Sequence, residues 1–190
     1  MNSHQHFILH KPYGYLSQFV NNQTKRKKKM LGELYDFPEG TMAIGRLDVN
    51  SEGLLLLTTD GKVSEYIRSK KVAKEYYVQV DGVITQNEIN LLKNGIEISI
   101  EGKKYTTKPC NASLISPPNF PNRTQKIRDE RHGPTSWISI TINEGKFRQV
   151  RKMTAVVGFP TLRLIRIRIG SIFLKDLQLG GVKEVEKLLS

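Results

Sequence analysis

Residues 45–61 read GRLDVNSEGLLLLTTDG. The four consecutive leucines, Leu54–Leu57, predict a strand that is buried on both faces and that ends in a tight turn. Gly45 and Gly53 flank Asp48 and allow sharp backbone geometry around it. An acid on a rigid element beside an apolar core is well placed for chemistry, although the spacing alone slightly favours a solvated surface loop.

The composition indicates a polyanionic partner. The 190 residues contain 30 Lys and Arg against 18 Asp and Glu, a net charge of +12. Neutralisation of nucleic-acid phosphates with release of counterions explains such an excess. An anionic membrane surface is the competing explanation, but no apolar run has membrane-spanning length and no signal-peptide pattern opens the chain. Because Cys110 is the only cysteine, we expect a reducing, cytoplasmic location.

The positive charge is concentrated in two places. Residues 121–170 hold 11 basic and 3 acidic residues, and residues 25–29 read KRKKK. The shorter run is compatible with a solvated loop, a localisation signal or an RNA contact. Residues 116–136 form a proline-bearing basic loop, interpreted either as a surface insertion or as an arm that clamps RNA.

Local patterns predict most of the secondary structure. Thr85 and Glu88 predict a capping box at the start of a helix that Gly95 ends. A hairpin is expected over residues 96–115, with its turn at 101–102. Further helices are expected at 31–37, 62–69 and 147–157, and further strands at 7–10, 74–81, 137–142 and 161–169.

The helix at 147–157 and the strand at 161–169 each carry basic residues opposite an apolar face. This pattern predicts one continuous basic surface. Its members are Arg148, Arg151, Lys152, Arg166 and Arg168.

Four motifs together identify a family. Residues 45–61 match G-R-L-D-x-x-[ST]-x-G-L-L-L-L-T-x-D-G without a gap, and residues 11–14, 74–76 and 144–153 match K-P-x-G, K-x-Y and E-G-[KR]-x-x-Q-V-[KR]-[KR]-M. The chain resembles the RsuA/RluB/RluE/RluF branch of the RNA pseudouridine synthases from Phe7 to Leu188. Its short RluE-type members lack an N-terminal S4 domain, and here too none is expected before Lys11.

The resemblance implies three catalytic residues. Asp48 is the essential carboxylate, Tyr76 stacks on the target base, and Lys146 pairs with Asp48. Tyr76 is equally compatible with ordinary strand packing, and Lys146 with a phosphate contact. No metal or other cofactor is expected, because the isomerisation adds and removes nothing.

The same resemblance and the basic pattern predict the RNA contacts. Arg46 is expected to fill the space that a flipped base leaves, and His10 stands where the family has asparagine. The predicted RNA-binding residues are Lys11, Arg46, Lys74, Arg148, Gln149, Arg151 and Arg166.

The implied fold is α+β: a mixed, mainly antiparallel central sheet flanked by helices, with two lobes around a central cleft, in one catalytic domain that covers residues 1–190. The implied partner is ribosomal RNA, most specifically 23S rRNA, bound by a monomer. Two rival interpretations stay open: a non-catalytic, ribosome-associated RNA-binding protein, and a Mg-dependent nuclease that uses Asp48, Glu52 and Asp60 as metal ligands.

Overall fold

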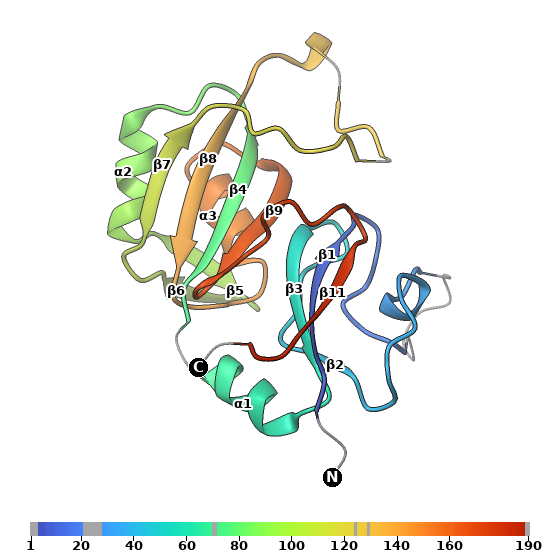
Figure 1. The fold of residues 1–190 in the computed structure, drawn as a ribbon. Coiled ribbons are helices and arrows are strands. Elements are labelled where there is room, and N and C mark those ends of the chain that lie inside the picture. Colours follow the sequence, from blue (N-terminus) through green and yellow to red (C-terminus); the bar gives the residue numbers. More distant parts are fainter. Residues whose placement is uncertain (1–3, 21–27, 70–71, 124, 129, 189–190) are drawn as a thin grey trace. The chain divides into compact units, whose positions relative to one another are not determined.

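The computed structural model describes residues 4–20, 28–69, 72–123, 125–128 and 130–188. The chain divides into two compact units, which correspond to the two expected lobes (Figure 1). Unit 1 comprises residues 1–72 and 166–190, and unit 2 comprises residues 73–165. Strand β9 (Thr161–Ile169) begins in unit 2 and ends in unit 1. The KRKKK run lies mostly outside the described residues.

Unit 1 is built on antiparallel pairing around the leucine-rich strand. Strand β1 (His6–Lys11) pairs with β3 (Glu52–Thr58) on one side and with β11 (Val182–Val185) on the other. The remaining elements of this unit are η1 (Leu31–Glu33), β2 (Met42–Ala43), α1 (Gly61–Ser69) and β10 (Ile172–Phe173).

Strand β3 confirms the prediction from its four leucines. All seven residues of the strand are buried, and Leu54–Leu57 are 0% exposed. Leu55 and Leu57 join Phe7, Leu9 and Leu31 in one apolar cluster of unit 1. Burial on both faces explains why the run is continuous instead of alternating.

Unit 2 has a second antiparallel sheet segment, in the order β4–β8–β7. Its helices α2 and α3 lie against β7 and β5 respectively (Figure 1). The elements are β4 (Lys74–Asp81), α2 (Gln86–Asn94), β5 (Glu97–Ile100), β6 (Lys103–Thr106), β7 (Asn111–Ile115), η2 (Glu130–His132), β8 (Thr135–Ile142) and α3 (Gln149–Val156).

The local signals in unit 2 are confirmed where they are strongest. Thr85 and Glu88 form the capping box of α2, and Gly95 ends the helix with φ 92°. Glu101 and Gly102 both adopt left-handed backbone conformations in the β5–β6 turn, with φ 50° and 79°. These conformations match a tight two-residue hairpin.

Three predicted elements are wrong in extent. The helix expected at 31–37 is only the 3₁₀ turn η1. The hairpin expected at 96–115 covers only 97–106, because β7 pairs with β8 instead. The helix expected at 147–157 begins at Gln149, because Arg148 has a left-handed backbone with φ 53°.

The fold class is therefore confirmed as α+β, with a mixed, mostly antiparallel sheet and, in the described part of the chain, three α-helices.

Candidate active site

Asp48 lies in unit 1, in the turn that leads into β3. Gly45 and Gly53 have φ 73° and 105°, so both adopt the backbone that favours glycine. The backbone N–H of Ser51 donates to the Asp48 carbonyl at 2.9 Å and closes the turn. Leu47 is buried, while Arg46 is exposed and Asp48 is half-buried.

The residues on both sides of Asp48 are held by the segment that follows β1. The Ser17 hydroxyl donates to the Leu47 carbonyl and accepts from the Leu47 N–H, each at 2.9 Å. The Gly14 N–H donates to the Val49 carbonyl at 2.8 Å. The K-P-x-G segment thus fixes the backbone that carries the carboxylate. No sequence pattern pointed to Ser17, because its partner is 30 positions away.

Gly53 is required by a close approach to β9. A Cβ atom at Gly53 would lie 2.3 Å from the backbone oxygen of Arg166. The Arg166 Nε atom donates to the Leu54 carbonyl at 2.8 Å. This packing locks the start of β3 against the part of β9 that belongs to unit 1.

Arg166 does not face outward as predicted. It is only 3% exposed, so the expectation that it extends a continuous basic surface is wrong. Its Nη2 atom is buried without a hydrogen-bond partner in the described structure. The alternation of β9 failed as a guide because Leu164–Arg166 are all buried, whichever way they point.

Lys11, also predicted to bind RNA, is 0% exposed. Its Nζ atom donates to the Pro12 carbonyl at 2.9 Å. Burial lowers the pKa of Lys11 to about 7, against the opposing effect of the Glu52 carboxylate; Arg166 lowers the pKa further, and Asp48 raises it. Lys11 therefore belongs to a buried group of charges that includes Glu52 and Arg166, and direct contact with RNA phosphates would require it to leave this environment.

Of the three acids of the nuclease hypothesis, Asp48 and Glu52 both act on Lys11, whereas Asp60 lies at the start of α1. Asp60 accepts hydrogen bonds from the N–H groups of Lys62 and Val63 at the start of α1, so it serves as a helix cap. Glu52 is 0% exposed. Across the residues that the structure describes, no group of three or more His, Cys, Asp or Glu side chains could hold a metal ion.

Tyr76 lies in unit 2, on the buried face of β4 with Val78 and Val80. Tyr76 is 8% exposed, which fits ordinary strand packing as well as a small contact surface for a base. Lys74, at the start of the same strand, is half-buried.

The motif at 144–153 forms a hydrogen-bonded turn before α3. The Glu144 carboxylate accepts from the Tyr105 hydroxyl and from the Gln149 amide. The Gln149 Oε1 atom accepts from the Lys146 N–H at 3.0 Å. Gln149 is 3% exposed, so its predicted contact with RNA gives way to a structural role at this turn.

The cations of this motif differ in exposure. Lys146 is exposed, and its Nζ atom lies 4.8 Å from the centroid of the Tyr105 ring. Arg148 is exposed, whereas Arg151 is half-buried. Lys152 donates to the Ser99 carbonyl. Of the predicted residues, the structure therefore groups Asp48, Lys11 and Arg166 in unit 1. In unit 2 it brings Lys146 and Arg148, in the turn before α3, close to Gln149 and Arg151 in the first turn of that helix.

The structure contains no helix, among its described residues, that is long and apolar enough to cross a membrane.

Comparison with known proteins places these motifs in a family. Residues 5–156 match the family model described as RNA pseudouridylate synthase. The chain is 41% identical, over 180 residues, to "Ribosomal large subunit pseudouridine synthase E" of Vibrio vulnificus, covering 94% of this chain and 74% of that protein. It is 31% identical, over 182 residues, to "Ribosomal large subunit pseudouridine synthase B" of Bacillus subtilis, covering 95% and 67%.

A solved structure agrees with the sequence relatives. The structure described as "Crystal structure of pseudouridylate synthase" matches with a TM-score of 0.76 and 26% identity, covering 97% of this chain and 71% of that one. These matches leave no support for the nuclease hypothesis. The chain belongs to the RNA pseudouridylate synthase family and is an enzyme that isomerises uridine to pseudouridine.

Proposed function

We propose that this enzyme converts a specific uridine of large-subunit (23S) ribosomal RNA to pseudouridine, with Asp48 as the essential carboxylate. Relatives that share 39–41% of their residues with the chain carry the name ribosomal large subunit pseudouridine synthase E, which supports this substrate. The observation that supports the role of Asp48 is that hydrogen bonds fix the backbone on both sides of it. Hydrogen bonds fix the backbone of Leu47 and Val49, while the Asp48 side chain remains half-exposed.

The reaction explains why a fixed carboxylate is needed. The bond between uracil N1 and C1′ of the ribose breaks, a bond between C5 and C1′ forms, C5 loses a proton and N1 gains one. A carboxylate can attack C1′, or it can promote elimination to a glycal that adds back through C5. Both routes need the carboxylate beside the sugar and charged, and neither consumes a cofactor.

Other side chains would handle the base. A uridine inside structured RNA must leave its stack before it can react. Arg46, exposed two residues before Asp48, is proposed to occupy the vacated space. Tyr76 is proposed to stack on the flipped uracil, a contact worth about 1–3 kcal/mol per base. Lys146 is proposed to pair with Asp48 and keep it ionised.

We also propose that the enzyme acts as a monomer and that it is located in the cytoplasm. The single cysteine is compatible with a reducing compartment. Burial raises the pKa of the Cys110 thiol to about 11, so this thiol stays protonated at neutral pH.

The test maps pseudouridine on unmodified large-subunit ribosomal RNA by primer extension after carbodiimide treatment. The wild-type protein should create one stop that Asp48→Ala and Asp48→Asn abolish. Asp36→Ala, which removes an exposed acid of unit 1, should retain the stop. Affinity for the RNA should be nearly unchanged in all three variants, which would show that they remain folded.

Two outcomes would reject parts of this proposal. An Asp48→Ala variant as active as the wild type would remove the catalytic role of Asp48. RNA binding without any new pseudouridine would favour the non-catalytic, ribosome-associated alternative for this RNA.

A further inference from the structure

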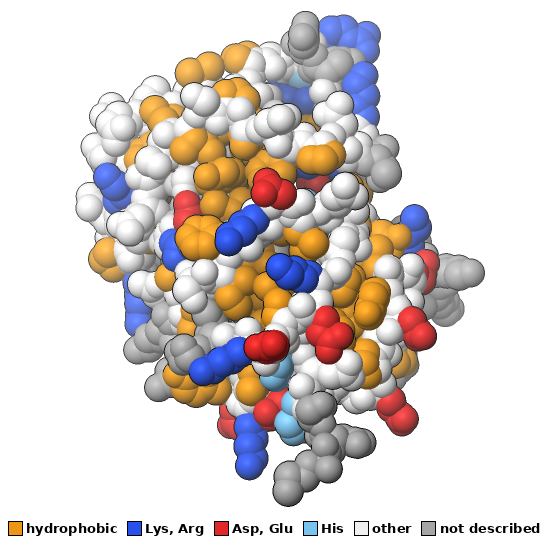
Figure 2. Space-filling model, viewed as in Figure 1, with side chains coloured by type: hydrophobic (Ala, Val, Ile, Leu, Met, Phe, Trp, Pro, Cys, Tyr) orange, Lys and Arg blue, Asp and Glu red, His pale blue; other side chains and the backbone are white. Residues whose placement is uncertain are grey.

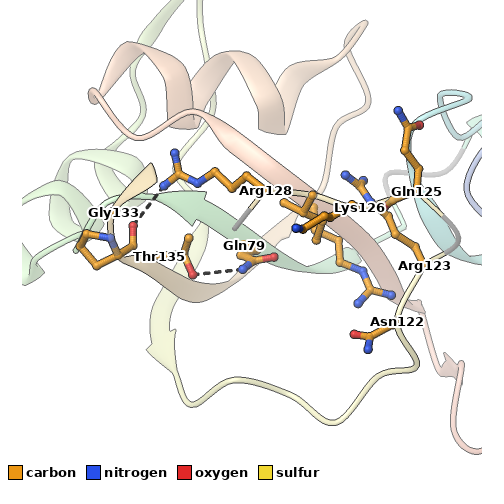
Figure 3. Close-up of a pocket in the computed structure, with 11 residues that line it drawn as sticks. Gln79, Asn122, Arg123, Gln125, Lys126, Arg128, Gly133 and Thr135 are labelled. Carbon is orange, nitrogen blue, oxygen red and sulfur yellow. Dashed lines mark hydrogen bonds between the residues drawn. The ribbon is translucent and has the colours of Figure 1, made fainter. Parts of the chain in front are cut away.

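A pocket of about 800 Å³ lies in unit 2, between the 116–136 loop and strands of the sheet (Figure 3). Of the described residues that line it, four are cationic and none is acidic. Its volume falls within the usual range for ligand sites in proteins. The cations are Arg123, Lys126, Arg128 and Arg163, and the neutral polar residues include Gln79, Asn122, Gln125 and Thr135.

The walls of this pocket are fixed by specific contacts. Arg163, on β9 and only 6% exposed, donates to the Pro121 carbonyl at 2.8 Å. Arg128 forms an ion pair with Asp81 at the end of β4 and donates to the Pro134 carbonyl at 3.2 Å. The loop is therefore tied to the sheet at Pro121 and at Arg128, on either side of Arg123 and Lys126, which favours a fixed surface over an unconstrained insertion.

The other two cations of the pocket lie in the middle of the loop. Lys126 is exposed, and the half-buried Arg123 donates from its Nε atom to the Gln125 carbonyl at 2.8 Å, within the loop itself. In Figure 3 Arg123 lies beside Gln125, and Lys126 lies between them and Arg128. In Figure 2 basic side chains also gather at the upper end of the view, over the segment that carries η2.

An aromatic pair stands beside these charges. Tyr77, which shares a face of β4 with Gln79, packs against Phe120 with ring centroids 6.3 Å apart. Phe120 comes two residues before Asn122 in the loop, and both rings are half-buried. Cations next to partly exposed aromatic rings and amide side chains are the combination that binds single-stranded nucleic acid, because phosphates and base faces are both satisfied.

We propose that this unit 2 pocket binds the phosphodiester backbone of a single RNA strand, with Arg123 and Lys126 as its phosphate contacts. The inference rests on the proposed function, because that function identifies RNA as the anion that the pocket binds. It assigns to the 116–136 loop a role in holding the substrate. Arg128 and Arg163 are positioning residues here, because their bonds to Asp81 and Pro121 shape the pocket.

The experiment measures binding by fluorescence anisotropy with a labelled, uridine-free oligoadenylate of about ten nucleotides as the probe, within the usual site size for single strands. The test variant is Arg123→Ala/Lys126→Ala, which leaves the bonds of Arg128 and Arg163 in place. It should weaken binding about tenfold at about 0.1 M salt, and the slope of log K against log salt should fall by about 1.4, because each single-strand phosphate contact contributes about 0.7. Lys103→Ala, which removes an exposed charge from β6 of the same unit, should change neither quantity.

A second variant separates charge from folding. Arg123→Lys/Lys126→Arg keeps both charges and should restore binding. The inference is overturned if the alanine variant binds with the affinity and salt slope of the wild type, or if the charge-conserving variant is as weak as the alanine variant. In the active enzyme, the alanine variant should raise KM for ribosomal RNA and leave kcat unchanged.

Failure of this inference and failure of the proposed function give different results. The binding assay does not depend on catalysis. It can be repeated after Asp48→Ala is introduced into the wild-type protein and into the alanine variant of the pocket. If the wild-type protein forms no pseudouridine, but the alanine variant of the pocket binds the oligonucleotide less tightly, the RNA site is supported and the proposed function is rejected. If the wild-type protein is active, but the alanine variant binds as tightly as the wild type, the proposed function stands and the RNA site is rejected.

Discussion

The cations beside Asp48 and the cations of the 116–136 loop and the turn before α3 differ in burial. In unit 1, Lys11 and Arg166 are buried, and they donate to the backbone carbonyls of Pro12 and Leu54. In unit 2, Lys146, Arg148 and Lys126 are exposed. A positive charge in the sequence therefore does not by itself predict contact with RNA, because a buried cation forms its hydrogen bonds within the protein.

The difference follows from what each unit must hold. Unit 1 positions one carboxylate, so the segments around Asp48 are joined by buried hydrogen bonds and by the close approach of Gly53 to Arg166. The exposed cations of unit 2 are proposed to contact a large polyanion, which requires side chains in solvent, whereas the buried Arg163 holds the 116–136 loop. Three predictions test this contrast, in decreasing order of expected effect.

The largest effect is expected from Gly53→Ala in unit 1. The new Cβ would meet the backbone of Arg166 at 2.3 Å, at a position with φ 105°, so strain and overlap add together. We expect a loss of about 4 kcal/mol in unfolding free energy and a Tm lower by about 10 °C. Thermal unfolding followed by circular dichroism measures both.

Gly61→Ala is the matched control for this substitution. It lies at the first residue of α1 with no atom within 4 Å of its added Cβ, so its Tm should stay near that of the wild type. A wild-type Tm for Gly53→Ala would show that β3 and β9 do not need their close approach.

The second effect concerns Lys146 in unit 2. If Lys146 pairs with Asp48 as proposed, Lys146→Ala should lower the single-turnover rate constant at saturating RNA about tenfold, equivalent to about 1.4 kcal/mol. If it contacts a phosphate, only the affinity and its salt dependence should change. Rapid-quench measurement of pseudouridine formation separates the two results.

Arg151→Ala makes this test sharper. Arg151 is half-buried in the same motif, whereas Lys146 is exposed. A large loss of rate in Arg151→Ala, together with a normal rate in Lys146→Ala, would transfer the pairing role to Arg151.

The smallest effect is a change in the pH dependence of stability caused by Lys11. Its folded pKa of about 7 lies below the ordinary value of 10.5, so between these pH values the unfolded chain binds the proton that the folded chain has released. The contribution of Lys11 to stability therefore rises with pH through this window, by at most about 1.4 kcal/mol per pH unit. Below about pH 7 the cost of burying the charge is fully present.

Urea unfolding at several values between about pH 8 and 9, inside this window, measures the contribution. Lys11→Met should lose the upward slope, whatever its absolute stability. Lys103→Met, at an exposed site in unit 2, should keep the slope of the wild type. Identical slopes in all three proteins would mean that Lys11 titrates as an ordinary surface lysine.

The predictable parts of the fold have causes that lie within a few residues. The α2 cap depends on Thr85 and Glu88, three positions apart, and the β5–β6 turn depends on Glu101 and Gly102. The leucine run of β3 predicts its own burial, because four adjacent apolar side chains occupy both faces of a strand. The start of α3 was predicted two residues too early, because Arg148 adopts a left-handed backbone that the spacing of apolar residues does not indicate.

The sequence by itself determined the family, the acid proposed for catalysis and the strand that follows it. These depend on residue types at fixed spacing in GRLDVNSEGLLLLTTDG, where glycines permit the turn and leucines require burial. Only the tertiary structure decided that Ser17 holds Leu47, that Lys11 and Arg166 are buried, and that the 116–136 loop closes a cationic pocket over the sheet. Contacts between residues distant along the chain decide burial, and burial determines whether a positive charge stabilises the protein or remains available to RNA.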